Sequence, residues 1–160
     1  MQSFAPVTRV SIRFSRYLCL LNNGLMEQSS NYLFVYGTLL GDGNEFAFYL
    51  TTNCKFQQKG RFKGNLYDAG EYPAAIADSH STNYVYGSIF LMPADEAILK
   101  YLDDYEGFGS GQVQPNLFMR EMVEVETADG PFSCWMYLYN LPVDGLRLIG
   151  SGDYLAYKNA

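Results

Sequence analysis

The segment 132–139 is apolar at nearly every position, and this feature most constrains what the chain can fold into. Such a continuous run predicts a strand that is covered on both of its faces. Residues 117–126 predict a second long strand, and a hairpin turn is expected at 128–131, where Asp129 and Gly130 stand. A hairpin with one strand buried on both sides requires a sheet that packs against other elements or curls on itself.

Other strand patterns are interspersed with a few helical ones. Residues 55–63 alternate between basic or polar and apolar positions, which predicts a strand with one face in water. Gly64-Asn65 then predicts a turn before a strand that opens at 66–67. The remaining predicted elements are strands at 32–36, 72–77 and 84–91, a helix at 45–50 capped by Asn44, and a helix that starts near Pro93. Many strands with two or three helices predict an α+β fold with a curled sheet or a small barrel.

The helix that ends at Glu106-Gly107 carries the strongest functional signal. Its apolar stripe includes Ile98 and Leu102, and Glu106 follows Leu102 by four residues, so it projects from the same inward face. Burial and the negative end of the helix dipole both raise the pKa of a glutamate from its usual ~4.3. That shift suits proton transfer near neutral pH. The alternative is that Glu106 lies on a frayed last turn and faces water.

A second informative segment is Tyr36-Gly37-Thr38-Leu39, which follows the predicted strand 32–36. Consecutive backbone N–H groups at the end of a strand can form a nest for a carboxylate or an oxyanion. Gly37 permits a close approach of the backbone, and Thr38 adds a hydroxyl group. The same pattern also occurs in ordinary turns.

Together these segments resemble the γ-glutamylcyclotransferase-like family, in its γ-glutamylamine cyclotransferase and AIG2-like branch. The resemblance covers roughly 32–157 and rests on segments 35–39, 102–107 and 151–154, with 64–67, 72–74, 85–87 and Arg120 in addition. It implies a small mixed β-barrel with flanking helices that uses no metal or cofactor. It also implies Glu106 as the catalytic proton acceptor and Tyr36, Gly37, Thr38 and Leu39 as the loop that binds the γ-glutamyl part of a small-molecule substrate.

The chemistry implied by the resemblance fits these residues. The α-amine of a γ-glutamyl compound can attack its own γ-carbonyl, which closes the lactam 5-oxoproline and releases an amine. One carboxylate with a raised pKa can serve as base and then as acid. Phe118 stands where the family often has Tyr, and Tyr154 where it often has Trp, which leaves the released amine open. The alternative function is a non-catalytic binding or regulatory protein on the same barrel.

Other candidates have simpler explanations. Asp103 and Asp104 are expected on the solvent side of their helix, and Arg120 either neutralises a buried acid or pairs on the barrel wall. Asp153 is either a supporting group of the site or a cap after Gly152. His80 is expected in a solvated turn at 78–82.

Composition excludes several classes of protein and of site. Hydrophobic residues make up 48% of the chain and charged residues 18%, which excludes disorder as the default state of the chain, and a net charge of −6 argues against a nucleic-acid partner. Cys19, Cys54 and Cys134 form no C-x-x-C pair and, with a single histidine, make no conventional zinc site. The odd cysteine count fits a reducing cytosol, and the sequence is silent on oligomeric state.

The N-terminal residues differ from the rest of the chain. Residues 1–25 contain Arg9, Arg13 and Arg16, whereas all 17 acidic residues follow them. This pattern indicates an organellar transit peptide or an extension upstream of a true start at Met26. The apolar run 17–21 is too short for a secretory core or a membrane span. We therefore expect a leader at 1–30, disordered or an incorrectly assigned start, and one domain at 31–160. The expected location is cytoplasmic, or organellar if the leader is a transit peptide.

A chain that begins at Met26 is expected to melt within a few degrees of the full-length protein, because 1–25 has no pattern that would tie it to a core. Thermal melting of both chains, followed by circular dichroism, measures the difference. Insolubility of the shorter chain, or a loss of more than about 2 kcal/mol in the free energy of unfolding, would show that the leader is structural.

Overall fold

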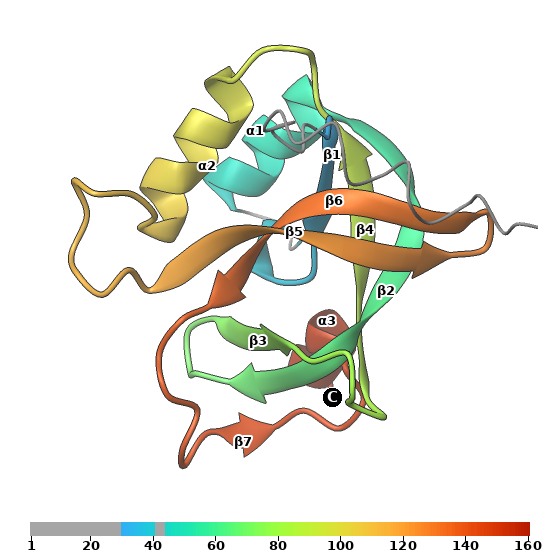
Figure 1. The fold of residues 1–160 in the computed structure, drawn as a ribbon, viewed down its shortest axis with the longest axis vertical. Helices are drawn as coiled ribbons and strands as arrows, with labels where there is room; N and C mark the ends of the chain where they lie inside the picture. Colours follow the sequence, from blue (N-terminus) through green and yellow to red (C-terminus); the bar gives the residue numbers. More distant parts are fainter. Residues whose placement is uncertain (1–29, 41–43) are drawn as a thin grey trace, which may run out of the picture.

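The computed structural model describes residues 30–40 and 44–160, so the predicted leader falls almost entirely outside the described residues. The described chain forms seven strands, three α-helices and a short 3-10 helix, η1 (Figure 1). Their bounds are β1 Tyr32–Val35, η1 Thr38–Leu40, α1 Glu45–Asn53, β2 Lys55–Asp68, β3 Pro73–Ala77, β4 Tyr84–Leu91, α2 Ala97–Glu106, β5 Phe118–Thr127, β6 Gly130–Tyr139, β7 Arg147–Leu148 and α3 Tyr154–Lys158.

Five of these strands form a closed barrel. Neighbouring strands follow the order β2-β4-β1-β6-β5, and β5 returns to β2 at the pair Arg61 and Glu126. Strands β1 and β6 run parallel, whereas the other pairs in the ring are antiparallel. Strands β3 and β7 pair with the far end of β2 and lie below the ring in Figure 1. The structure thus confirms the predicted α+β fold, a small mixed β-barrel with flanking helices.

The predicted turn at Gly64-Asn65 is wrong, because β2 runs through it without a break. Strand β2 pairs with β4 up to Lys63 and with β3 from Gly64 onward. A Cβ atom at Gly64 would collide with the backbone carbonyl oxygen of Ile76 on β3. Glycine is therefore needed here for the close approach of two backbones where β2 changes partner, rather than for a turn.

The two longer helices lie close to their predicted positions. The side chain of Asn44 accepts the N–H of Phe46 at 2.8 Å, as a helix cap does, and α1 then continues to Asn53. Helix α2 begins at Ala97, later than expected, because Asp95 accepts the Ala97 N–H at 3.0 Å and so holds the chain in a cap conformation.

The end of α2 agrees with the prediction. Gly107 has a φ of +69°, in the left-handed region that glycine enters without strain, and its N–H bonds to the carbonyl of Asp103. Ile98 and Leu102 are 3% and 0% exposed, as the predicted stripe requires. Glu106 is therefore the last residue of an ordered helix.

Apolar side chains gather in two clusters on the two faces of the barrel wall. One cluster draws on all the barrel strands and fills the interior, and the other joins β1 and β6 to the faces of α1 and α2. Strand β6 contributes to both, since Met136 belongs to the first and Tyr137 to the second. The apolar run of 132–139 is thus covered on both faces from Cys134 to Leu138, whereas Ser133 is exposed.

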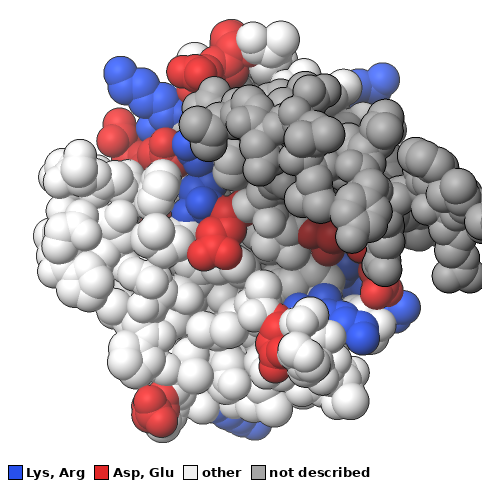
Figure 2. Space-filling model, viewed as in Figure 1, with Lys and Arg blue, Asp and Glu red and all other residues white. Residues whose placement is uncertain are grey.

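Helices α1 and α2 lie side by side against the barrel and are joined by stacked aromatic rings (Figure 1). The ring of Phe46 lies 3.6 Å from that of Tyr105, measured between centroids, and Tyr49 lies 4.1 Å from Tyr101. In the part of the chain that the structure describes, no helix has the length and apolar character needed to cross a membrane. Most of the described surface on the face in Figure 2 is uncharged, and some of its basic groups lie beside acidic ones whereas others stand apart.

Candidate active site

The structure brings the predicted site residues together in one pocket. Glu106 and the loop Tyr36-Gly37-Thr38-Leu39 line one pocket that is open to solvent. The two predicted segments are far apart in the sequence, and they meet because β1 ends where the C-terminus of α2 packs on the barrel. The other described lining residues are Leu33, Phe34, Val35, Tyr72, Pro73, Phe118 and Tyr137.

Glu106 faces this pocket rather than bulk water. Its side chain follows the buried stripe of Ile98 and Leu102, and the residue is partly exposed because the pocket is open. The surrounding walls remove water from the carboxylate, and this burial raises the pKa of Glu106 to about 7. At neutral pH the carboxylate can therefore both accept and donate a proton.

Tyr36 stands beside Glu106 as a neutral hydroxyl group. Its O–H donates to the backbone carbonyl of Tyr137 at 2.5 Å, which anchors the ring between β1 and β6. Burial raises the pKa of Tyr36 far above its usual value, and the nearby carboxylate of Glu106 adds to this effect. Tyr36 therefore keeps its proton across the physiological range and does not compete with Glu106 as a base.

The loop after β1 forms the tight turn η1. The N–H of Leu40 bonds to the carbonyl of Gly37 at 3.0 Å and closes the turn. The first N–H groups of a helical turn have no acceptor within it, so Thr38 and Leu39 provide backbone donors at the pocket. The nest and the binding of a ligand there stay predictions.

Gly37 is not needed for a left-handed turn, because its φ lies outside the left-handed region. A Cβ atom at Gly37 would lie 2.6 Å from Cγ of Pro73 and 3.2 Å from its Cδ. The loop therefore packs directly on the start of β3, and the absence of a side chain at Gly37 sets the position of this pocket wall.

Sequence reasoning missed a cluster that holds α2 on the barrel. Asp103 was expected in solvent, but its side chain is only 21% exposed. Nη1 of Arg120 lies 3.1 and 3.0 Å from the two carboxylate oxygens of Asp103, and the hydroxyl of Tyr137 donates to one of them at 2.8 Å. Of the two roles considered for Arg120, the structure shows the neutralisation of a partly buried acid.

The cluster bridges three elements, because Asp103 lies on α2, Arg120 on β5 and Tyr137 on β6. Burial raises the pKa of Asp103, although the hydrogen bond from Tyr137 and the charge of Arg120 act in the opposite direction. Asp103 lies about one helical turn before Glu106, so these contacts fix the rotation of the helix that carries Glu106. No periodicity in the sequence indicates the cluster, since it depends on strand register.

Comparison with known proteins identifies the family. The sequence profile described as "Gamma-glutamyl cyclotransferase, AIG2-like" matches residues 33–156, a stretch that contains the whole described pocket. The chain belongs to the γ-glutamylcyclotransferase family, AIG2-like.

Individual relatives agree with this assignment. The γ-glutamylcyclotransferase family protein YtfP of Escherichia coli (strain K12) is 34% identical over 127 residues, which cover 77% of this chain and 95% of YtfP. The solution structure of E. coli ytfP aligns with a TM-score of 0.55 at 30% identity, over 79% of this chain and 98% of that one. The crystal structure of an AIG2-like protein from Mus musculus gives a TM-score of 0.56 at 25% identity, over 70% and 80% of the two chains.

Other candidate residues of this γ-glutamylcyclotransferase family member lie outside the pocket lining. Burial raises the pKa of Cys54 to about 11 and that of Cys134 to about 12, so neither thiol is activated. The side chain of His80 is 96% exposed, as expected, and Asp153 caps α3 by accepting the N–H of Ala156 at 3.0 Å. Within residues 30–40 and 44–160, no group of three or more His, Cys, Asp and Glu residues is placed to hold a metal ion.

Replacing Arg120 by Met is expected to lower the free energy of unfolding by about 1–3 kcal/mol, because Asp103 would keep its burial and lose its charged partner. Urea denaturation near neutral pH measures the change. Arg61→Met is the matched control, since Arg61 and Glu126 form a pair whose side chains are 42% and 44% exposed, and its loss should cost below about 1 kcal/mol. Equal costs for the two variants would contradict the assigned role of Arg120.

Replacing Gly37 by Ala is expected to destabilise the protein by about 1–3 kcal/mol, because the new methyl group overlaps the ring of Pro73. Pro73→Ala removes the Cγ and Cδ atoms that cause the overlap. The double variant should therefore recover at least about 1 kcal/mol relative to the sum of the two single changes. Additive effects in the four-protein denaturation cycle would show that Gly37 is needed for another reason.

Proposed function

We propose that the pocket is the active site of a cyclotransferase that converts the γ-glutamyl group of a γ-glutamyl amine or peptide to 5-oxoproline and releases the amine. The observation that carries this proposal is the shared pocket of Glu106, whose pKa is raised to about 7, and the loop Tyr36-Gly37-Thr38-Leu39. Membership of the γ-glutamylcyclotransferase family supports the same reaction class. The family match itself assigns no role to Glu106 or to the loop.

The reaction needs one proton acceptor that later becomes a donor. The substrate's α-nitrogen attacks its γ-carbonyl carbon, and the proton that this nitrogen gives up passes to the carboxylate of Glu106. The bond from the γ-carbon to the leaving nitrogen then breaks, and Glu106 returns the proton to that nitrogen. The products are the five-membered lactam and a free amine, so no water, metal or redox partner takes part in the balance.

The other pocket residues position the substrate. An intramolecular attack requires the glutamyl chain to be folded with its two ends close together, which a small walled cavity favours. In our proposal the N–H groups of Thr38 and Leu39, with the Thr38 hydroxyl, hold the α-carboxylate. Tyr36 remains protonated beside Glu106 and supplies a hydroxyl group that carries no negative charge.

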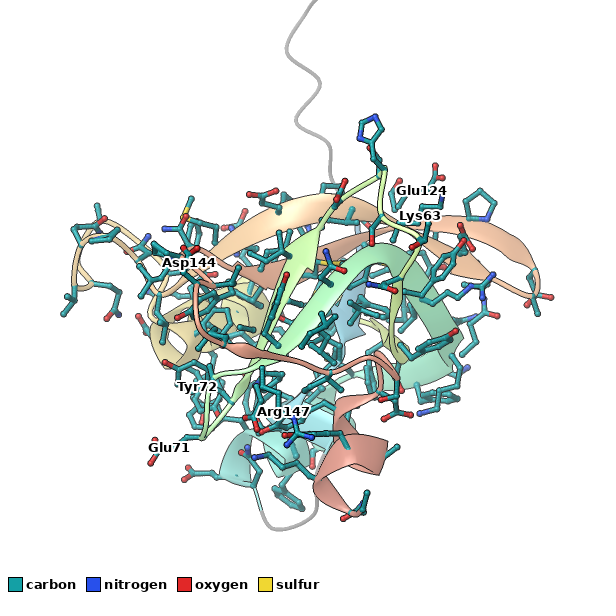
Figure 3. The ribbon with its side chains drawn as sticks, turned by 90° about the horizontal axis from the view of Figure 1, so that it is seen from below. Lys63, Glu71, Tyr72, Glu124, Asp144 and Arg147 are labelled. Atoms are coloured by element: carbon teal, nitrogen blue, oxygen red, sulfur yellow. The ribbon has the colours of Figure 1, made fainter. Side chains whose placement is uncertain are left out.

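Replacing Glu106 by Gln is expected to lower turnover of γ-glutamyl amines by roughly 10²–10⁴-fold, because the amide keeps the shape of the side chain but cannot accept a proton. Release of 5-oxoproline from a panel of γ-glutamyl amines and peptides, in the presence of a chelator, measures turnover. The matched control is Glu124→Gln, an exposed position on β5 that lies away from the loop of Tyr72 (Figure 3). Its rate should stay at the wild-type value.

The pH dependence of turnover and of stability, measured for the wild-type protein and Glu106→Gln, tests the raised pKa of Glu106. Wild-type turnover should fall as the pH drops below about 7, when Glu106 takes up its proton. Between pH 4.5, the ordinary value, and about 7 the folded state binds more protons at Glu106 than the unfolded state, so wild-type stability falls as the pH rises through this range. Glu106→Gln should therefore melt at a higher temperature than wild type at pH 8, and this gain should disappear near pH 4.5.

Two results would count against the proposal. Near wild-type turnover by Glu106→Gln would show that another group is the base. Binding of γ-glutamyl compounds without any turnover by the wild-type protein would instead favour a binding or regulatory role for the pocket.

A further inference from the structure

Side chains of α3 bind the turn that joins β2 to β3. The hydroxyl of Tyr157 donates to Oδ2 of Asp68, the last residue of β2, at 2.8 Å. Nζ of Lys158 donates to the carbonyl of Gly70 at 3.0 Å and lies 3.7 Å from Oδ1 of Asp68. Helix α3 accordingly lies next to the far end of β2 (Figure 1). We refer to Asp68, Tyr157 and Lys158 as the α3 clamp.

Asp68 also determines the shape of this turn. Its Oδ1 atom accepts the N–H of Gly70 at 2.9 Å, and the N–H of Ala69 donates to the carbonyl of Tyr72 at 3.1 Å. Gly70 has a φ of +93°, which is a backbone conformation that favours glycine. The hydrogen bond from Tyr157 lowers the pKa of Asp68, and the Gly70 N–H acts in the same direction. One charged carboxylate at neutral pH therefore holds both the turn and α3.

The turn leads directly into the wall of the pocket. Tyr72 and Pro73 follow it and line the pocket, and Pro73 packs on Gly37 of the 36–39 loop. Asp68 and Pro73 are direct partners in the pairing of β2 with β3. Proline has no N–H to donate to this pairing, and in the described part of the chain β3 pairs with β2 alone. The position of Pro73 therefore depends on how firmly Asp68 is held.

Strand β3 and helix α2 control different parts of the pocket. The backbone of Ala75 on β3 interacts with the hydroxyl of Tyr36, so β3 meets the 36–39 loop at a second point. Glu106, in contrast, is carried by α2 and takes its position from the contacts of Asp103. A displacement of β3 should therefore disturb the loop and leave the proton-transfer group in place.

We propose that the α3 clamp positions the pocket wall at 72–73, and through it the 36–39 loop, for binding of the substrate. Its three members are positioning residues, because none of them belongs to the described lining of the pocket. The inference rests on the proposed function, since it takes the 36–39 loop to be the part that binds the substrate. A contact that contributes only to the stability of the fold would give different results in the experiments below.

Tyr157→Phe tests the positioning directly, because it removes the hydroxyl group that binds Asp68 and keeps the ring. Backbone amide signals of the ligand-free protein, recorded by NMR, should move at Tyr72, Gly37 and Thr38 relative to the wild type. The described contacts of Tyr157 do not include the last two residues, so a change there must pass through Pro73.

Tyr84→Phe is the matched control. The hydroxyl of Tyr84 donates to a carboxylate oxygen of Glu126 at 3.5 Å, and Tyr84 is partly buried, as Tyr157 is. Tyr84 is absent from the described pocket lining. This variant also loses a hydrogen bond between a tyrosine and a carboxylate, but it should leave the amide signals of 36–39 unchanged.

Kinetics test whether the displacement affects the substrate. In Tyr157→Phe, KM for γ-glutamyl-ethylamide should rise roughly 3- to 10-fold while kcat stays within about two-fold of wild type, because Glu106 keeps its position. Asp68→Ala should give the same pattern. Asp68→Asn should recover part of the affinity, because its amide oxygen can still accept the N–H of Gly70. Release of 5-oxoproline, followed well below the melting temperature of each variant, measures kcat and KM.

Binding measurements keep this inference separate from the proposed function. The ethylamide is titrated by calorimetry into Glu106→Gln and into the double variant Glu106→Gln with Tyr157→Phe, and the double variant should bind it more weakly. Weaker binding by the double variant, without any turnover by the wild type, supports the clamp and overturns the proposed function. Where the ethylamide neither binds nor reacts, the amide signals at Gly37 and Thr38 decide for or against the clamp.

Two results overturn the clamp even where 5-oxoproline is released. Amide signals that move only within 68–72 would show that the clamp shapes its own turn and nothing beyond it. A lower melting temperature of Tyr157→Phe, with unchanged amide signals at 36–39 and an unchanged KM, would show a contact that contributes to stability alone.

Discussion

The attachment of α2 to the barrel through Asp103, Arg120 and Tyr137 is the interaction on which the site depends. A helix of 10 residues is marginal in water by itself, so its orientation comes from tertiary contacts. Burial of Ile98 and Leu102 holds α2 against the barrel, but apolar burial has no direction. The hydrogen bonds of Asp103 do have direction, and a rotation of α2 that broke them would also turn Glu106 out of the pocket.

Burial raises the pKa of two carboxylates on the same helix, but only one of them has a charged partner. Asp103 is bonded to the guanidinium of Arg120 and the hydroxyl of Tyr137, so its charge is supported while it holds the helix in place. Glu106 lies in a pocket whose described lining contains no cation, and burial raises its pKa to about 7. Asp103 therefore acts through its directed contacts with β5 and β6, whereas Glu106 has no charged partner among the described lining residues, lowers stability at neutral pH and is available for proton transfer.

Local patterns in the sequence were sufficient for most elements of the fold. The apolar run of 132–139 required cover on both faces, and it obtains this cover from the barrel interior and from the helices. The patterns failed at residues whose role depends on segments that are distant in the sequence. Gly64 looks like a turn because glycine is common in turns, yet it marks the position where β2 changes its neighbour. Asp103 looks solvent-exposed because Arg120 reaches it only through the register of β5 and β6.

The sequence by itself indicated most elements of this protein and the glycine-containing loop after β1, and it offered the inward projection of Glu106 as one of two alternatives, because helical and strand periodicities are local properties of the chain. Only the tertiary structure decided that Glu106 and this loop share one pocket, that Pro73 closes against Gly37, and that Tyr72 and Phe118 form an aromatic wall. These contacts depend on barrel closure and strand register, which bring together residues that are far apart in the chain. Burial, and with it the raised pKa of Glu106, is for the same reason a property of the folded barrel and not of the helix that carries the residue.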